Sequence, residues 1–192
     1  MYLYDKLLAR AAAGQPVRVG LIGAGKFGSM VLSQAQHIKG MHVAAVADLD
    51  LDKAKKAFTR VGWDIKTCFS ASASEAIAAT KTWLTEDVSA VCNMAEIDCI
   101  IEATGHPLFG VRHALQAIES GKHVIMVNVE ADILSGPYIA QKASERGVIY
   151  SMAYGDQPAA ICELVDWVHS NGFELVAAGK GMNFQPEYRY ST

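Results

Sequence analysis

The sequence predicts an α/β fold, a doubly wound parallel sheet of the Rossmann type. Short apolar runs alternate with helical patterns along most of the chain, and glycines mark most of the turns between them. A glycine-rich loop follows the first apolar run, and an acidic residue ends the second. Because crossovers between parallel strands are right-handed, this alternation winds helices onto both faces of one sheet.

Length and composition limit the class of protein. The chain has 192 residues, 51% of them hydrophobic and 19% charged, so we expect a large buried core and little disorder. The net charge of −3 and the lack of a basic block imply no nucleic-acid partner. No apolar run approaches the roughly 20 residues needed to span a membrane. With no signal-peptide layout at the start, we expect a cytoplasmic protein without a membrane partner.

Cysteine usage points to the same compartment. Four cysteines are scattered along the chain without a C-x-x-C pair. Buried, reduced thiols are therefore expected in preference to disulfides or a zinc site.

The glycine loop is the strongest functional signal. Between an apolar strand and a helix predicted over residues 26–38, the chain reads Gly23-Ala24-Gly25-Lys26-Phe27-Gly28. In a G-x-G-x-x-G loop the first glycine permits a tight turn, the second lets a pyrophosphate approach the backbone, and the third lets the helix pack closely on the strand. The helix N-terminus offers free N–H groups to the phosphates. We predict that these six residues bind a dinucleotide.

Asp48 completes this fingerprint. It follows a strand predicted over residues 42–47 and lies 20 positions after Gly28, where its carboxylate could accept hydrogen bonds from the adenosine ribose. A carboxylate repels a 2′-phosphate, so Asp48 favours NAD over NADP. Lys53 is close in sequence and could offset that preference.

The other elements follow from periodicity and turn residues. A helix over residues 3–13 precedes the core, and Ser72 with Glu75 forms a capping box for a helix that ends near residue 80. Further helices are predicted over residues 51–60, 87–94, 109–120, 137–146 and 159–170. Further strands are predicted over residues 66–69, 81–84, 97–103, 122–127, 148–152 and 173–178, with a turn at 128–132.

Ligands of an open parallel sheet bind beyond the carboxyl ends of the strands, so the loops that follow strands hold the site candidates. Thr104 and Gly105 could touch a ribose or the pyrophosphate, or could only shape a turn. Asn128 could hydrogen-bond the nicotinamide half of the cofactor, or could be a turn asparagine. His106 is expected to start a helix rather than to act as an acid.

Three ionisable residues are candidates for catalysis. Glu130 and Asp156 could hold a divalent metal ion that polarises a substrate carbonyl or hydroxyl, or could be a cap and a surface acid. Lys180 lies between two glycines and could stabilise a developing alkoxide or bind a phosphate, or could be a solvated turn lysine.

Five segments of the chain together carry a family resemblance. They are residues 19–28, 102–105 (Glu-Ala-Thr-Gly), 127–132 (Val-Asn-Val-Glu-Ala-Asp), 155–158 (Gly-Asp-Gln-Pro) and 177–181 (Ala-Ala-Gly-Lys-Gly). With these motifs the chain resembles the homoserine-dehydrogenase-like oxidoreductases that carry a C-terminal SAF domain. One branch comprises the 1-deoxy-D-xylulose-5-phosphate reductoisomerase-like enzymes of isoprenoid biosynthesis, which use NADPH and a divalent metal.

The resemblance implies NAD(P) as the cofactor class and a longer protein. Residues 1–182 would be the NAD(P)-binding domain with its N-terminal helix, and residues 183–192 the start of a catalytic and dimerisation region. A homo-oligomer is implied for the full-length protein. In one respect the chain departs from homoserine dehydrogenases, which tend to have Asn-Lys where Asn128 is followed by Val129.

Together these inferences predict the cofactor domain of an NAD(P)-dependent oxidoreductase. A hydride would pass between C4 of the nicotinamide and a carbonyl or alcohol carbon of a small polar substrate. A non-enzymatic dinucleotide-binding redox sensor or regulatory module is the alternative. A methyltransferase also binds a nucleoside on a glycine loop, but the G-x-G-x-x-G spacing and the helix directly behind it argue against one.

Overall fold

A computed structural model describes residues 3–70, 72–154 and 157–179 of the chain. The chain forms two compact units, Met1–Met152 and Ala153–Thr192, and each is described by itself. The predicted domain boundary at residue 182 lies outside the described residues and stays a prediction.

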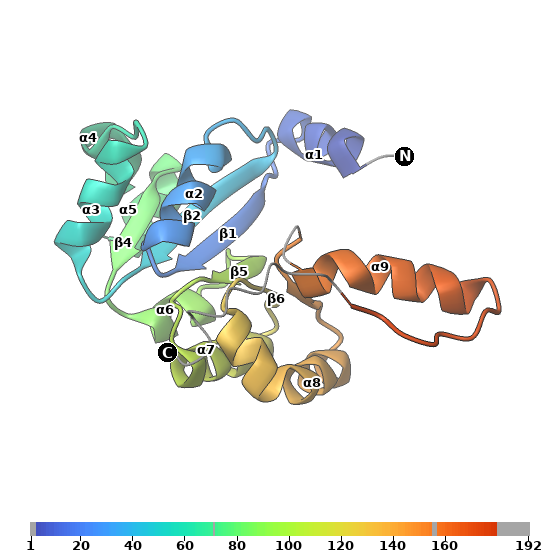
Figure 1. The fold of residues 1–192 in the computed structure, drawn as a ribbon. Coiled ribbons are helices and arrows are strands. Elements are labelled where there is room, and N and C mark those ends of the chain that lie inside the picture. Colours follow the sequence, from blue (N-terminus) through green and yellow to red (C-terminus); the bar gives the residue numbers. More distant parts are fainter. Residues whose placement is uncertain (1–2, 71, 155–156, 180–192) are drawn as a thin grey trace. The chain divides into compact units, whose positions relative to one another are not determined.

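The first unit is built on one seven-stranded parallel sheet (Figure 1). The strands are β1 (Val17–Ile22), β2 (Met41–Ala47), β3 (Phe69–Ser70), β4 (Thr82–Thr85), β5 (Cys99–Glu102), β6 (His123–Met126) and β7 (Tyr150–Met152). They lie in the order β3-β4-β2-β1-β5-β6-β7, and every neighbouring pair is parallel. The chain turns outward in opposite directions from the β1–β5 junction, which confirms the predicted doubly wound sheet.

One helix precedes the first strand, and the others lie between successive strands. In chain order they are α1 (Leu3–Ala12), α2 (Lys26–Ala35), α3 (Leu51–Arg60), α4 (Ile65–Cys68), α5 (Ala73–Ala79), α6 (Val88–Asn93), α7 (Pro107–Glu119) and α8 (Val129–Arg146).

Two apolar clusters fill the space between helices and sheet. Leu21 of β1 packs with α2 and α3 in a cluster that includes Leu32 and Phe58. The next residue, Ile22, belongs to a second cluster with α6, α7 and α8 that includes Ile118 and Ile139. Successive residues of a strand face opposite sides, so helices cover both faces of the sheet. This is why β5 is buried along its whole length and reads as an unbroken apolar run apart from Glu102.

The strand predicted over residues 66–69 is wrong for residues 66–68. Asp64 caps a single helical turn, α4, by accepting a hydrogen bond from the backbone N–H of Lys66 at 3.0 Å. Only Phe69 and Ser70 form the edge strand β3. The ring of Phe69 packs edge-on against Phe58 with centroids 4.2 Å apart, so a tertiary contact decides where the strand begins.

The turn predicted over residues 128–132 is also wrong, because helix α8 begins at Val129 and runs through Pro137. The Asn128 side chain caps the helix by accepting a hydrogen bond from the N–H of Ala131 at 3.1 Å. A second hydrogen bond fixes the first turn of α8, because the Tyr150 hydroxyl donates to the Asp132 carboxylate at 2.6 Å. These contacts outweigh the local cost of an internal proline.

In the second unit, helix α9 (Gln157–Ser170) is followed by residues 171–179 without regular structure. The strand predicted over residues 173–178 is therefore wrong. An apolar pattern makes a strand only where a neighbouring strand accepts its backbone hydrogen bonds, and no strand is described in this unit. Phe173 stays exposed and stacks on Trp167 with ring centroids 6.3 Å apart.

Among the described helices of both units, none is long and apolar enough to cross a membrane.

Candidate functional site

The glycine loop connects β1 to α2 with the geometry that its sequence predicts. Gly23 has a φ of +95°, and a Cβ there would lie 2.8 Å from the carbonyl oxygen of Ala103. A Cβ at Gly28 would collide with the carbonyl oxygen of Gly23. A Cβ at Gly25, by contrast, would have none of the described heavy atoms outside its neighbours within 4 Å. Two glycines are therefore required by packing, and the third leaves room for a ligand beside the backbone.

The start of α2 is suited to an anion. Gly25 is its N-cap residue and supplies no side-chain hydrogen bond to the first turn. Helical N–H groups of a first turn have no partner within the helix and carry the positive end of its dipole. A phosphate that lies against Gly25 meets these groups directly.

Asp48 follows β2 and lies against the glycine loop. Its Oδ2 accepts a hydrogen bond from the N–H of Ala24 at 2.7 Å, and its Oδ1 accepts one from the N–H of Asp50 at 2.9 Å. The carboxylate thus ties the carboxyl end of β2 to the loop. Each oxygen keeps a further lone pair for a ribose hydroxyl.

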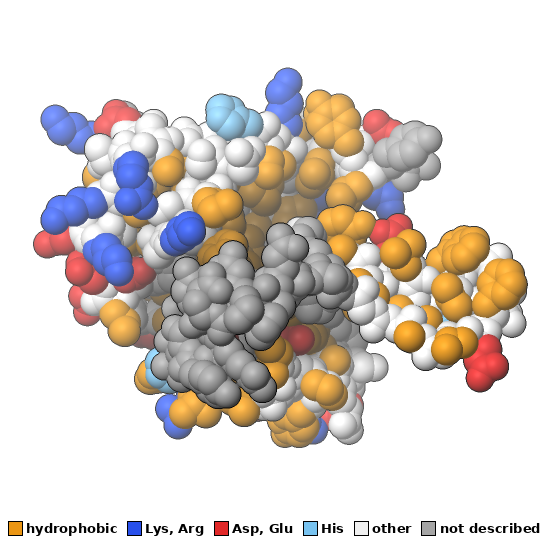
Figure 2. All heavy atoms as spheres, viewed as in Figure 1, with side chains coloured by type: hydrophobic (Ala, Val, Ile, Leu, Met, Phe, Trp, Pro, Cys, Tyr) orange, Lys and Arg blue, Asp and Glu red, His pale blue; other side chains and the backbone are white. Residues whose placement is uncertain are grey.

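A basic groove lies beside the loop, between α2 and α3. It has a volume of about 690 Å³ and is lined by Ala24 and Gly25 together with four cationic side chains, those of Lys26, Lys53, Lys56 and Arg60. Arg60 is held in place by a hydrogen bond from its Nη2 to Ser29 Oγ at 2.8 Å. Figure 2 shows Lys and Arg side chains gathered over α3, with acidic ones among them. The groove adds positive potential beside Asp48.

The carboxyl ends of β5 and β6 hold a hydrogen-bonded network. Glu102, the last residue of β5, is fully buried. Its Oε1 accepts hydrogen bonds from the hydroxyl of Thr104 at 2.5 Å and from the N–H of Thr104 at 3.3 Å, and it lies 3.2 Å from Nδ1 of His113. The Asn128 Nδ2 donates to the carbonyl of His106 at 3.1 Å and reaches Thr104 Oγ1 at 3.5 Å. The loops after β5 and β6 are thereby joined.

The structure brings most of the predicted binding residues to one edge of the sheet. The loop from Gly23 to Gly28 lies beside Asp48 on one side and beside Ala103 and Thr104 on the other. Thr104 and Gly105 are exposed there, whereas Asn128 is buried with both side-chain groups engaged. His106 is the N-cap residue of α7, as its position predicts, without a side-chain cap.

The predicted catalytic and metal residues are only partly described. Glu130 is exposed on the first turn of α8. Asp156 and Lys180 lie outside the described residues. Within the part of the chain that the structure describes, no group of three or more His, Cys, Asp or Glu side chains could hold a metal ion. The metal site therefore stays a prediction.

Two features of this edge were not predicted as functional. Glu102 and His113 form the centre of the network, and Ser29 with Arg60 shapes the groove. A signal for Glu102 was present, since it is a charged residue at the end of an otherwise apolar strand. The partner of Glu102, 11 residues away on α7, follows from no sequence pattern.

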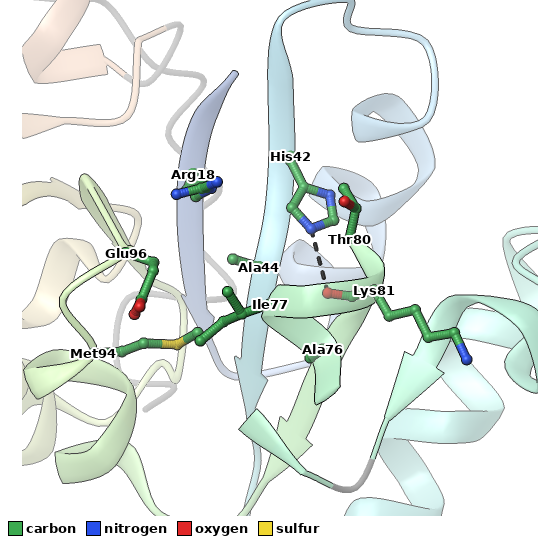
Figure 3. Close-up of a pocket in the computed structure, with 9 residues that line it drawn as sticks. All are labelled: Arg18, His42, Ala44, Ala76, Ile77, Thr80, Lys81, Met94 and Glu96. Atoms are coloured by element: carbon green, nitrogen blue, oxygen red, sulfur yellow. Dashed lines mark hydrogen bonds between the residues drawn. The ribbon is translucent and has the colours of Figure 1, made fainter. Parts of the chain in front are cut away.

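A second cavity lies at the opposite end of the sheet (Figure 3). Its volume is about 20 Å³, and it is lined by Arg18 and His42 near the amino ends of β1 and β2. The His42 Nε2 lies 3.3 Å from the carbonyl oxygen of Lys81, and burial lowers the pKa of the imidazole. A space of this size holds about one water molecule, so it is not a cofactor site.

Comparisons with known proteins agree with this geometry. Residues 17–127 match the family model described as an oxidoreductase family with an NAD-binding Rossmann fold, and residues 155–192 match the catalytic domain of oxidoreductase DRL. Homoserine dehydrogenase of Pseudomonas aeruginosa is 29% identical over 135 residues, which cover 70% of this chain and 28% of that protein.

Solved structures show the same fold at low identity. Scyllo-inositol dehydrogenase of Lactobacillus casei, with bound NAD(H) and scyllo-inositol, matches with a TM-score of 0.55 at 17% identity over 80% of this chain and 42% of that one. Biliverdin reductase of Synechocystis sp. PCC 6803, in complex with biliverdin and NADP⁺, matches with a TM-score of 0.53 at 18% identity over 81% of this chain and 42% of that one.

The chain thus spans less than half of each of these proteins. The family match, however, covers more than half of the chain and includes the glycine loop, Asp48 and Thr104. The predicted Rossmann fold and the predicted NAD(P) cofactor class are confirmed. This chain belongs to the oxidoreductase family with an NAD-binding Rossmann fold, the Gfo/Idh/MocA family.

Proposed function

We propose that this chain is the cofactor domain of an NAD(P)-dependent oxidoreductase that acts on a small polar substrate. The open face of Gly25, at the start of α2 and beside Asp48, carries the proposal. A dinucleotide on this face would place its pyrophosphate at the helix N-terminus and its adenosine ribose at the end of β2. The domain then supplies orientation and electrostatics, and the cofactor supplies the hydride.

We also propose that the reaction belongs to the homoserine-dehydrogenase-like group, with a 1-deoxy-D-xylulose-5-phosphate reductoisomerase-like branch as the closer relation. The match of residues 155–192 to the DRL catalytic domain and the resemblance to homoserine dehydrogenase support this assignment. Val129 after Asn128 separates the chain from the usual homoserine dehydrogenase pattern. In this proposal a longer, homo-oligomeric protein supplies the rest of the substrate site.

Three residues are proposed to act on the substrate. Glu130 and Asp156 would bind a divalent ion that polarises the substrate oxygen, and Lys180 would stabilise the developing alkoxide. Glu130 is accessible on the first turn of α8, as a ligand must be. Addition of EDTA is the direct test, since loss of turnover that Mg²⁺ or Mn²⁺ restores would support the metal.

The choice between NADH and NADPH rests on opposed charges. Asp48 disfavours a 2′-phosphate, whereas Lys26, Lys53, Lys56 and Arg60 favour it. Both carboxylate oxygens of Asp48 already accept backbone hydrogen bonds, which offset part of its negative charge. We therefore propose that the domain accepts NADPH.

Titration with NADH and with NADPH, followed by nicotinamide fluorescence, tests both proposals. We expect Lys53→Ala with Lys56→Ala to weaken NADPH binding at least tenfold and NADH binding little, since even one ionic hydrogen bond to the 2′-phosphate contributes roughly 1.5–3 kcal/mol. Lys142→Ala is the control, because that lysine pairs with Glu145 on α8. Equal loss for both cofactors would contradict the NADPH assignment, and binding of neither would contradict the function.

The alternative is a dinucleotide-binding redox sensor or regulatory module without turnover. The same glycine loop would serve it, so binding data do not separate the two. Hydride transfer to any added carbonyl substrate by the full-length protein, followed as loss of NAD(P)H absorbance, would eliminate the sensor.

A further inference from the structure

Glu102 is a buried carboxylate within an apolar surrounding. It is fully buried, and its register neighbours on β1 and β6 are Ile22 and Met126, both members of the second apolar cluster. Taking an ionised carboxylate out of water costs several kcal/mol unless hydrogen bonds and charges compensate. An apolar residue at this position would avoid that penalty, so the acid needs a reason other than packing.

The hydrogen bonds of Glu102 are unevenly distributed. Three groups converge on Oε1: the hydroxyl of Thr104, the N–H of Thr104 and Nδ1 of His113. Within residues 3–70, 72–154 and 157–179, Oε2 has no hydrogen-bond partner. A carboxylate that served only to satisfy buried donors would be expected to share them between both oxygens. Here two of the three contacts come from one residue, Thr104, which itself is exposed.

These contacts determine which hydrogen bonds the hydroxyl of Thr104 can make with a ligand. A hydroxyl has one proton to donate and two lone pairs to accept with. The proton of Thr104 Oγ1 is directed to Glu102, and the oxygen accepts two long contacts at 3.5 Å, from Asn128 Nδ2 and from the backbone N–H of His106. The oxygen is thus left as an acceptor, and because both of its accepted contacts are at the long end of the hydrogen-bond range, a ligand hydroxyl at shorter range can replace one of them.

The position of Thr104 identifies the ligand group. Strands β2 and β5 flank β1 on opposite sides. A dinucleotide with its adenosine ribose at Asp48 and its pyrophosphate at Gly25 must continue across β1 toward β5. Thr104 follows β5 and lies next to Gly23. A Cβ added to Gly23 would lie 3.0 Å from the backbone nitrogen of Thr104. The group that reaches it is the ribose attached to the nicotinamide.

We propose that Glu102 is a positioning residue for the nicotinamide half of the cofactor. The Glu102 carboxylate accepts a hydrogen bond from the Thr104 hydroxyl, so that Oγ1 of Thr104 faces the ligand as an acceptor for a hydroxyl of the nicotinamide ribose. Asn128 secures the loop from the side of β6. This inference rests on the proposed cofactor function and assigns one end of the ligand to a buried acid.

The test compares ligands that contain or lack the second ribose. ADP carries the adenosine half only, whereas ADP-ribose adds the second ribose without the nicotinamide. If NADPH is the preferred cofactor, their 2′-phosphorylated forms replace them. Calorimetric titration of the purified chain gives the dissociation constant of each ligand for wild type, Thr104→Val, Thr104→Ser and Glu102→Gln.

We expect Thr104→Val to weaken ADP-ribose and the dinucleotide about tenfold while ADP binds as to wild type, which is the loss of one hydrogen bond. Thr104→Ser keeps the hydroxyl and restores wild-type binding. Glu102→Gln weakens the same two ligands about threefold. Thr82→Val is the control, because it deletes another hydroxyl, one that donates to the carbonyl of Val43 at 2.7 Å at the amino end of β4.

Each other outcome overturns the proposal. Equal weakening of ADP and ADP-ribose by Thr104→Val would show a purely structural role for the hydroxyl. Unchanged binding of every ligand would show no role at all. If Glu102→Gln does not fold, Glu102→Asp replaces it, because it keeps the carboxylate but moves it away from Thr104, and unchanged binding of ADP-ribose by that variant would overturn the role of Glu102. A wild-type chain that binds neither ADP nor either dinucleotide would overturn the proposed function as well, and only that result would do so.

Discussion

Gly23 and Gly25 are two residues apart and have opposite surroundings. The first has a positive φ and lies against the backbone of Ala103, whereas the second faces open space with extended backbone geometry. One G-x-G motif therefore contains a glycine required for folding and a glycine that leaves room for a ligand. Sequence spacing treats them alike, and only the structure separates them.

This difference predicts that an alanine substitution lowers stability at Gly23 and weakens cofactor binding at Gly25. Gly23→Ala should lower the free energy of unfolding by about 1–3 kcal/mol, because a Cβ is strained at this φ and crowds the Ala103 carbonyl. Gly25→Ala should leave unfolding nearly unchanged and weaken dinucleotide binding at least tenfold. Urea unfolding and cofactor titration of both variants check this. Equal stabilities of the two variants would contradict the assigned roles.

Two buried thiols predict a response to alkaline pH. Burial raises the pKa of Cys92 to about 12 and that of Cys99 to about 12. A folded-state pKa above the unfolded one means that the unfolded chain loses its protons first. The stability these thiols contribute is complete below about pH 9, the ordinary thiol pKa, and is lost as the pH rises toward 12.

The free energy of unfolding of wild type should therefore fall between pH 8 and pH 10, in part because of these two thiols. In Cys92→Ala and in Cys99→Ala this fall should be smaller by about 1 kcal/mol each. Urea unfolding at the two pH values gives the differences. Lysines and tyrosines titrate equally in all the proteins, so their effects cancel. Cys162→Ala, at an exposed position, should behave as wild type, and a response like that of the buried pair would argue against burial as the cause.

At the scale of elements, helix α8 joins the fold to the site. Its cap residue, Asn128, satisfies Ala131 through Oδ1 and holds the carbonyl of His106 through Nδ2. The Asp132 carboxylate accepts from Tyr150 of β7, and burial together with this hydrogen bond raises the pKa of the tyrosine. The start of α8 is thus held from two neighbouring elements, which explains why the helix begins eight residues before Pro137.

Asn128→Ala should cost about 1–2 kcal/mol of stability and also weaken dinucleotide binding, because the cap and the tie to the β5 loop are lost together. Asn128→Ser keeps a capping oxygen and should recover most of the stability. The control is Ser72→Ala, which removes the cap of α5 far from the loop and should cost about 1 kcal/mol without a change in binding. Thermal melts and cofactor titrations separate the two effects.

At the scale of the whole molecule, the sheet, both apolar clusters and the glycine loop lie within Met1–Met152. A shortened chain of residues 1–152 should therefore unfold cooperatively and bind the dinucleotide within about threefold of the 192-residue chain. Calorimetry and fluorescence titration are the measurements. A broad, non-cooperative melt of the short chain would show that residues 153–192 are needed for the core.

Short segments of the sequence were enough to determine the fold class and the ligand class of this protein. The G-x-G-x-x-G loop, Asp48 at the end of its strand and the alternation of apolar runs with helices specified a dinucleotide-binding parallel sheet, because each depends on a few consecutive residues. The capping box at Ser72 shows the limit of such signals. Ser72 caps α5 as predicted, but the Glu75 carboxylate accepts from Ser70 instead of closing the box.

Tertiary structure decided the rest. The helix through Pro137 and the start of β3 at Phe69 depend on contacts with distant elements, Tyr150 and Phe58. Such contacts can reverse a local preference of about 1 kcal/mol. The same is true of Glu102, whose burial and whose partners Thr104 and His113 exist only once β5 and α7 are packed together. The sequence determined which ligand class this chain binds, and the packing of the sheet decided which residues are held ready for it.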